Sequence, residues 1–312
     1  MSRIQSLLLF SALPLAACSG DGGSSQPTPE GPHHTYVVSE ASVPVNNTQA
    51  REFGLDLNGD KSPDNQLGMV LSTLGGQGFD VQGAIAKAIG QGDIILLIDL
   101  QTGSYASTSG AGLQVKLGDK ATAMPAPCTG TADTACRHHL DGTGRFTIAA
   151  GSPDNAAVSG KVIGGTFDGG PGNISLKIAL GGPEGVQLDL IGARAKATGM
   201  SDTGIDSVIL AGALPQDDLN TKVIPAIHSQ IGPLVKRDCP GTVPPDCGCA
   251  AGNPTGRTIL NLFDTSPKDC TVTVDEIKNN SLIQSLLAPD VEIEGTQALS
   301  VGIKVKAVSG AF

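Results

Sequence analysis

Hydrophobic residues change their spacing along the chain, and each spacing predicts one kind of element. Two early stretches, 64–74 and 80–90, place apolar residues at helical spacing and predict two short helices. Between about residues 113 and 190 apolar residues alternate with polar ones, which predicts strands with one buried face. The alternating positions are Leu113, Val115, Leu117, Phe146, Ile148, Ile174, Leu176, Ile178, Leu180, Val186, Leu188 and Leu190.

The C-terminal third returns to helical spacing and then alternates again. Apolar residues over 219–234 predict a helix that is kinked or divided at Pro225 and Pro233. Alternation over 299–305 predicts a final strand. The predicted fold class is therefore α+β, mainly an antiparallel β-sandwich or open barrel with short helices and a C-terminal helix-loop-helix insertion at about 216–290.

The N-terminus has the composition of a secretory signal. Arg3 precedes an apolar stretch over 4–13, and the sequence LAAC ends at Cys18. This string resembles the bacterial lipobox, in which the signal is removed and the Cys becomes the lipidated first residue. The resemblance implies a signal peptide at 1–17, lipidation of Cys18 and attachment to the outer membrane through the lipid, on its periplasmic or cell-surface face.

Residues 18–48 are rich in Gly, Ser, Pro and polar side chains, which predicts a lipidated flexible tether. His33 and His34 lie in this segment and are expected to be solvated. Residues 49–312 are expected to form a single α+β domain.

Composition excludes one class of partner. The chain has 20 basic and 30 acidic residues, a net charge of −10, and only 3% aromatic residues. Nucleic-acid binding needs a basic surface and aromatic stacking platforms, so no nucleic-acid partner is expected.

Six cysteines remain after Cys18, and an even number in an exported chain predicts three disulfides. Cys128 and Cys136 close a short loop and are expected to pair. The other four, within 32 residues of each other, are expected to staple the C-terminal segment. Half a zinc site at Cys247 and Cys249 is the alternative. The four are Cys239, Cys247, Cys249 and Cys270.

The strongest chemical motif is an acidic loop over 56–64. Its oxygen donors occupy positions 1, 3, 5 and 9 of a calcium loop, and a backbone carbonyl serves position 7. Carboxylates this close in sequence repel each other unless a cation lies between them. The predicted Ca²⁺ ligands are Asp56, Asn58, Asp60, the carbonyl of Ser62, and Asp64.

The first loop departs from the EF-hand pattern at two positions. Lys61 occupies the usual glycine of position 6, and Leu67 stands where an EF-hand has Glu. Asp64 or Asn65 would have to complete the shell. The alternative is a turn without metal, in which Asp64 caps the next helix.

A second, weaker metal loop lies between two predicted helices over 258–287. It looks like an EF-hand with a cysteine at the glycine position, and Asp264 and Ser266 become ligands only with a one-residue insertion. The alternative is that Thr273 and Glu276 form a capping box, which explains the Glu without metal. The candidate ligands are Asp264, Ser266, Asp269 and Glu276.

Lipobox, tether and acidic loops together resemble bacterial outer-membrane lipoproteins with EF-hand-like or dockerin-like calcium loops, and that resemblance implies no activity. The chain carries no GxSxG, HExxH or phosphate-binding loop. We therefore expect a non-catalytic lipoprotein, stabilised by calcium and disulfides, that acts as a surface or periplasmic structural or binding module. The alternatives are an apolar-ligand carrier, because amphipathic sheets can enclose a cavity, and a secreted hydrolase.

Overall fold

The computed structural model describes residues 26–76, 80–178, 186–252, 254–265 and 267–312. The predicted signal peptide, the lipidation site Cys18 and the weaker ligand Ser266 lie outside the described residues, as does Leu180 of the predicted strands.

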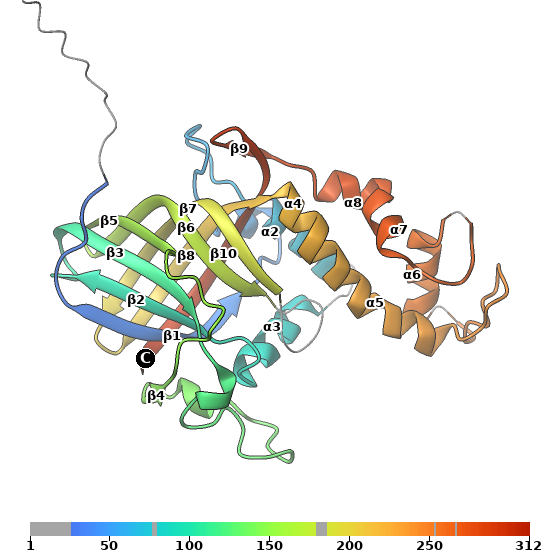
Figure 1. Cartoon of the computed structure of the whole chain (residues 1–312), viewed down its shortest axis with the longest axis horizontal. Coiled ribbons are helices and arrows are strands. Elements are labelled where there is room, and N and C mark those ends of the chain that lie inside the picture. The colour runs from blue at the N-terminus through green and yellow to red at the C-terminus, as the bar shows by residue number, and fades with distance from the viewer. Residues whose placement is uncertain (1–25, 77–79, 179–185, 253, 266) are drawn as a thin grey trace, which may run out of the picture.

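Among the described residues, eight antiparallel strands form a closed barrel (Figure 1). Each pairs with the next in the order β1–β2–β3–β5–β6–β7–β8–β10, and β10 pairs back to β1. The predicted antiparallel α+β fold is confirmed, and the β1–β10 pairing closes the ring. The bounds are β1 His33–Ser42, β2 Leu96–Thr102, β3 Thr108–Leu117, β5 Ala157–Ile163, β6 Thr166–Ile178, β7 Val186–Ser201, β8 Gly204–Pro215 and β10 Thr296–Ala311.

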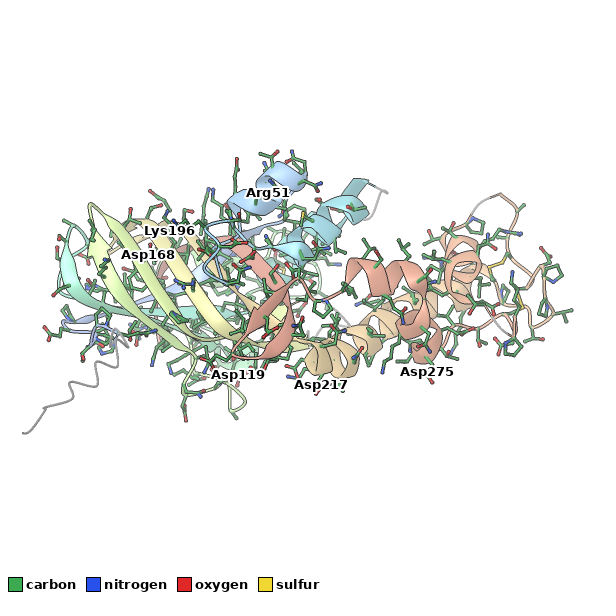
Figure 2. All side chains as sticks on the ribbon, turned by 90° about the horizontal axis from the view of Figure 1, so that it is seen from above. Arg51, Asp119, Asp168, Lys196, Asp217 and Asp275 are labelled. Atoms are coloured by element: carbon green, nitrogen blue, oxygen red, sulfur yellow. A yellow bond between two sulfur atoms is a disulfide. The ribbon has the colours of Figure 1, made fainter. Side chains whose placement is uncertain are left out.

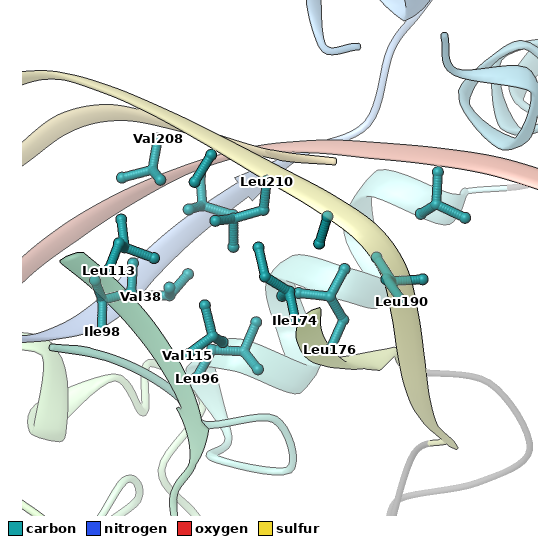
Figure 3. Close-up of a cluster of buried hydrophobic side chains, with 14 of the residues drawn as sticks. Val38, Leu96, Ile98, Leu113, Val115, Ile174, Leu176, Leu190, Val208 and Leu210 are labelled. Carbon is teal, nitrogen blue, oxygen red and sulfur yellow. The ribbon is translucent and has the colours of Figure 1, made fainter. Parts of the chain in front are cut away.

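Alternation along the strands separates a polar outer face from an apolar interior. On the outer face Asp168 of β6 lies directly opposite Lys196 of β7 (Figure 2). The interior is filled by aliphatic side chains from all eight strands (Figure 3). Those labelled in the close-up are Val38, Leu96, Ile98, Leu113, Val115, Ile174, Leu176, Leu190, Val208 and Leu210.

The two ends of the barrel are closed differently. Helices cover one end, where Val70, Ile89 and Leu219 join the interior core. They belong to α2 (Gln66–Gly76), α3 (Val81–Gly90) and the π-helical turn η3 (Leu219–Val223). The helices predicted at 64–74 and 80–90 are thus confirmed. The hairpin turns β2–β3, β5–β6 and β7–β8 form the other end, which we call the turn end.

Two segments cover apolar patches on the outside of the barrel. Residues 119–149 place Ala123 and Phe146 on Val37 and Leu97, and include η1 (Lys120–Thr122), η2 (His138–Leu140) and β4 (Gly144–Arg145). The hairpin of β9 (Val291–Ile293) with β10 covers part of the β8 face. A strand was predicted around Phe146 and Ile148, but Ile148 makes only an isolated bridge to Gly118. The side chain of Phe146 is nevertheless buried, because it packs on the barrel wall from outside.

The helical insertion projects from one end of the barrel (Figure 1). It runs from α4 (Gln216–Asp218) and η3 into α5 (Ile224–Asp238), where Pro225 lies in the first turn and Pro233 lies inside the helix. It continues through α6 (Thr255–Phe263), α7 (Val274–Asn279) and α8 (Ser281–Leu286). A separate small core holds these helices together, so the predicted insertion is confirmed.

The predicted tether is wrong for part of its length. Residues 33–42 form β1, whose Tyr36 and Val38 enter the interior while Val37 is buried against the outer segment 119–149. Because both faces of this strand are covered, its apolar residues are consecutive instead of alternating. Such a short run inside a polar segment does not stand out as a strand. Residues 47–52 form a further short helix, α1 (Asn47–Glu52).

Candidate functional site

The first acidic loop joins α1 to α2 and lies against the outer face of the barrel. An antiparallel bridge between Leu55 and Asp64 closes its base. Leu57 is buried in a small cluster with Ala211 and Ala213 of β8 and Val291 of β9. The loop is therefore anchored to the sheet on its apolar side, and its charged side faces outward.

Within the loop, side-chain oxygens accept hydrogen bonds from backbone N–H groups. The carboxylate of Asp56 accepts from Gly59 at 2.6 Å and from Lys61 at 3.0 Å. Asn58 accepts from Asp60 at 3.0 Å, and Asp60 in turn accepts from Ser62 at 2.7 Å. These consecutive Asx turns wind the chain tightly around one centre.

Lys61 adopts a left-handed conformation, with φ of 73°, at the position where an EF-hand has glycine. The sequence therefore departs from the EF-hand pattern here while the backbone keeps the sharp turn that the pattern requires. An L-residue in this region is strained, and the hydrogen bond to Asp56 holds it there.

Asp64 lies among like charges. Its carboxylate accepts from the N–H of Leu57 at 2.8 Å. Burial raises the pKa of Asp64, the bond from Leu57 opposes this, and the charges of Asp60, Asp290 and Asp56 raise the pKa further. Asp290 follows α8 and was missed by sequence reasoning, because more than 220 residues separate it from the loop. Its carboxylate accepts from both the N–H and the hydroxyl of Ser300.

The structure removes Asn65 from the candidate ligands. Its side chain is buried, donates to the carbonyls of Ala50 and Gly302, and accepts from the N–H of Gly68 and of Gly302. Asn65, not Asp64, therefore caps α2, so the predicted cap is wrong, while the turn without metal stays an alternative to the calcium loop. The carboxylate of Asp64 stays turned toward the loop.

The donor set of this loop suits a hard cation. It offers carboxylates, an amide oxygen and a carbonyl, the oxygen ligands that calcium takes. Within the described part of the chain, no three His, Cys, Asp or Glu side chains are already gathered closely enough to hold a metal. The residues that could hold Ca²⁺ are Asp56, Asn58, Asp60, the carbonyl of Ser62, and Asp64.

The second acidic loop repeats the same turn with one extra residue. Asp264, which is buried, accepts from the N–H of Asp269 at 3.1 Å and of Cys270 at 3.0 Å. Cys270 has φ of 68°, the left-handed conformation that Lys61 has in the first loop. Asp269 accepts from the N–H and hydroxyl of Thr271, and these bonds lower its pKa.

Both carboxylate oxygens of Glu276 accept hydrogen bonds within this second loop. Thr273 and Glu276 form the capping box of α7, and the other Glu276 oxygen accepts from the N–H of Thr265 at 3.1 Å. The capping alternative is confirmed. Disulfides also fix this region, because Cys270 is bonded to Cys247, and Cys239 to Cys249.

Cys128 is bonded to Cys136, so the predicted pair is confirmed and the six cysteines that follow Cys18 all form disulfides. Sulfurs committed to disulfides cannot act as thiolate ligands, and the zinc alternative at Cys247 and Cys249 is therefore wrong.

A second polar cluster, at the turn end, was missed by sequence reasoning. His34 is half-buried, and its Nδ1 lies 2.6 Å from the hydroxyl of Tyr105. Tyr105 donates to Asp202 at 2.8 Å and lies 3.1 Å from Tyr36. These are the only two tyrosines in the chain. The expectation that His34 is solvated is wrong, because β1 carries it into the barrel wall.

Comparison with known proteins returned no match among family models, curated proteins or solved structures. None of the helices in the described ranges is long and apolar enough to cross a membrane.

Proposed function

We propose that this chain is a non-catalytic binding or structural module, stabilised by disulfides and by one calcium ion in the loop 56–64. The observation that carries the proposal is the electrostatic position of Asp64. Its carboxylate is partly buried and close to the charges of Asp56, Asp60 and Asp290. A divalent cation at the centre of the loop would neutralise this repulsion and use the lone pairs that remain on oxygens already accepting one hydrogen bond in the turns.

Calcium would act on the fold through the places where the loop is anchored. Leu57 packs on β8 and β9, and Asn65 bonds to β10, so a rigid loop ties α1 and α2 to the barrel wall. An ion that binds only the folded loop stabilises the protein by RT ln(1 + [L]/Kd), about 2.7 kcal/mol at 100 times Kd. Without a Glu at position 12, the Kd for calcium is expected at the weak end of the range for calcium loops, roughly 10⁻⁴ to 10⁻³ M.

Thermal unfolding with millimolar calcium and with a chelator tests this proposal. Calcium should raise the melting temperature of the wild-type protein, and Asp60→Ala should abolish most of that shift. Asp269→Ala should change it less, because the second loop is held by a capping box and a disulfide. Asp154→Ala, an exposed carboxylate before β5, is the matched control. If calcium changes neither melting temperature nor calorimetric heat, the loop is a turn without metal.

The lipid anchor is the second part of the proposal and rests on the lipobox resemblance at Cys18. A lipidated chain would be attached to the outer membrane by its N-terminus, with the described residues on the periplasmic or cell-surface side. Cys18→Ala should remove the lipid mass and the partitioning into detergent. An unchanged mass and partition would refute the anchor.

Two observations bear on the alternative functions. The apolar side chains inside the barrel pack against one another in one cluster, which disfavours an apolar carrier because a carrier needs such side chains to line an open cavity. A hydrolase needs a base held by a buried orienting group, whereas the Asp202 carboxylate beside His34 in the turn-end cluster is 84% exposed. His33 and His138 pair with the more buried Asp99 and Asp133, but both pairs lie outside that cluster. Both observations favour the binding module.

A further inference from the structure

A polar pocket of about 450 Å³ opens at the turn end of the barrel. It lies between β1, the β7–β8 turn, the C-terminal end of β10 and residues 142–145. The backbone pairs Tyr36 with Ser309 and Gly310 with Gly144, so three adjacent strands form its floor. The volume is within the range of small-molecule sites, and no predicted metal ligand lies in its wall.

One side of this pocket is a chain of hydrogen bonds whose protons can be assigned by counting. Tyr36 gives its single proton to the carbonyl of Ser201 at 2.8 Å, and Tyr105 gives its own to Asp202. With both hydroxyl protons given away, the 3.1 Å contact between the two tyrosine oxygens has no proton, and we assign the Tyr105 oxygen as the acceptor of Nδ1–H of His34. In this tautomer Nε2 is the acceptor of the His34 ring.

Arg145 supplies donors to the same wall. Arg145 contributes a guanidinium that forms no ion pair or side-chain hydrogen bond with the described residues, and a guanidinium can only donate. Asp202 is the only carboxylate among the lining residues, and it can only accept. Thr35, Thr143 and Ser309 also line the wall. The hydroxyls of Thr143 and Ser309 already donate to the Asp141 carboxylate and the Gly142 carbonyl, so they can only accept from a ligand.

Charge decides which class of ligand matches these groups. An anion would meet Asp202 and a chain of net charge −10, and a cation would meet Arg145. A zwitterion would pair with both side chains, but Asp202 is 84% exposed and Arg145 is exposed as well. Solvated ion pairs contribute little to affinity, so a zwitterion gains no advantage over a neutral ligand at these two residues. Ligand hydroxyls instead both donate and accept, and can satisfy Asp202, Arg145 and Nε2 of His34 together.

We propose that this pocket binds a neutral polyhydroxylated ligand, a mono- or disaccharide unit, through Asp202, Arg145 and His34. It binds without cleaving, because glycoside hydrolysis uses a pair of carboxylates and the wall contains one. The inference gives the proposed binding module a ligand class. It rests on the non-catalytic part of the proposed function and does not require calcium.

The test is saturation-transfer NMR of the purified protein with neutral sugars at millimolar concentration: glucose, galactose, N-acetylglucosamine and maltose. Glycine, acetate and methylammonium are the charged probes. At least one sugar should give a signal, and Asp202→Asn and Arg145→Gln should each weaken its binding about tenfold. Asp154→Asn and Arg51→Gln, an exposed arginine on α1 (Figure 2), should leave it unchanged.

Three results would overturn the ligand class. They are no signal from any sugar, a sugar signal that survives both pocket variants, and stronger binding of a charged probe than of every sugar. Each titration is repeated with calcium and with a chelator. Loss of the calcium-dependent melting shift with sugar binding intact contradicts only the calcium proposal, and the reverse result contradicts only the sugar proposal.

Discussion

Asn65 and Gly302 bond to each other in both directions. The Asn65 amide donates to the Gly302 carbonyl at 3.0 Å, and its oxygen accepts from the Gly302 N–H at 2.8 Å. The pair joins the end of the acidic loop to the middle of β10 across 237 residues of sequence. Together with the packing of Leu57, it links the candidate calcium loop to the barrel.

Removal of this link should destabilise the whole domain. Asn65→Ala leaves buried backbone groups of Gly302, Ala50 and Gly68 without their partner. Such groups cost about 1–3 kcal/mol each when unsatisfied, and partial rehydration lowers the sum, so we expect a loss of roughly 2–4 kcal/mol. Urea unfolding measures it. The exposed Asn155→Ala should change stability by less than about 0.5 kcal/mol, and an equal loss in both variants would contradict the prediction.

Lys61→Gly should stabilise the calcium-free protein. Lys61 has φ of 73°, where an L-residue costs about 1–2 kcal/mol and glycine pays about 0.5–1 kcal/mol in chain entropy. The expected net gain is about 0.5–1 kcal/mol by urea unfolding. Lys61→Ala is the matched control, because it removes the same charge and keeps the strain. A similar gain in both variants would assign the effect to charge.

His139 should make stability depend on pH between 6.5 and 4. Both ring nitrogens are buried without a hydrogen-bond partner among the described residues, and the ring meets Phe146 edge-on. Burial, then the charges of Arg137, Lys120 and His138, lowers the pKa of His139 to about 4. The unfolded chain therefore binds the proton first as pH falls, and the folded state loses stability through this window, by about 3 kcal/mol at pH 4.

Substitution of His139 by Leu isolates this contribution. Urea unfolding of His139→Leu should show a flatter dependence on pH than the wild type across the same window. The pKa of Asp133 is also lowered, first by the hydrogen bond from the N–H of Thr129, but this carboxylate acts at lower pH than the histidine. An identical slope in the two proteins would mean that His139 is not desolvated.

Removal of each disulfide should lower the free energy of unfolding by a different amount. Cys128–Cys136 spans 8 residues and Cys247–Cys270 spans 23. The entropy of closing these loops in the unfolded chain gives about 2.5 kcal/mol for the first and about 3.4 kcal/mol for the second. Replacing both cysteines of each pair by serine and comparing urea unfolding checks the order. A larger loss from the Cys128–Cys136 pair would show that native-state contacts, not loop closure, set the effect.

Local patterns in the sequence were sufficient to predict several helices and strands and part of the candidate site. Helical spacing located α2 and α3, and alternation located parts of β3, β6, β7 and β10, because one face of each element meets a single apolar environment. The oxygen spacing of the first loop also lies within nine consecutive residues. Its Asx turns form between near neighbours, so sequence alone could place them.

Tertiary structure decided what depends on distant segments. Residues 33–42 become a strand because β10 and β2 supply backbone partners on both sides. No local sequence pattern predicts this pairing. Asn65 is a cap rather than a ligand because Gly302 lies beside it, and Asp290 joins the loop from the far end of the chain. The cluster of His34, Tyr105 and Asp202 forms only when the barrel closes. Hydrogen bonds and charges act through space, so spacing along the chain cannot reveal these partners.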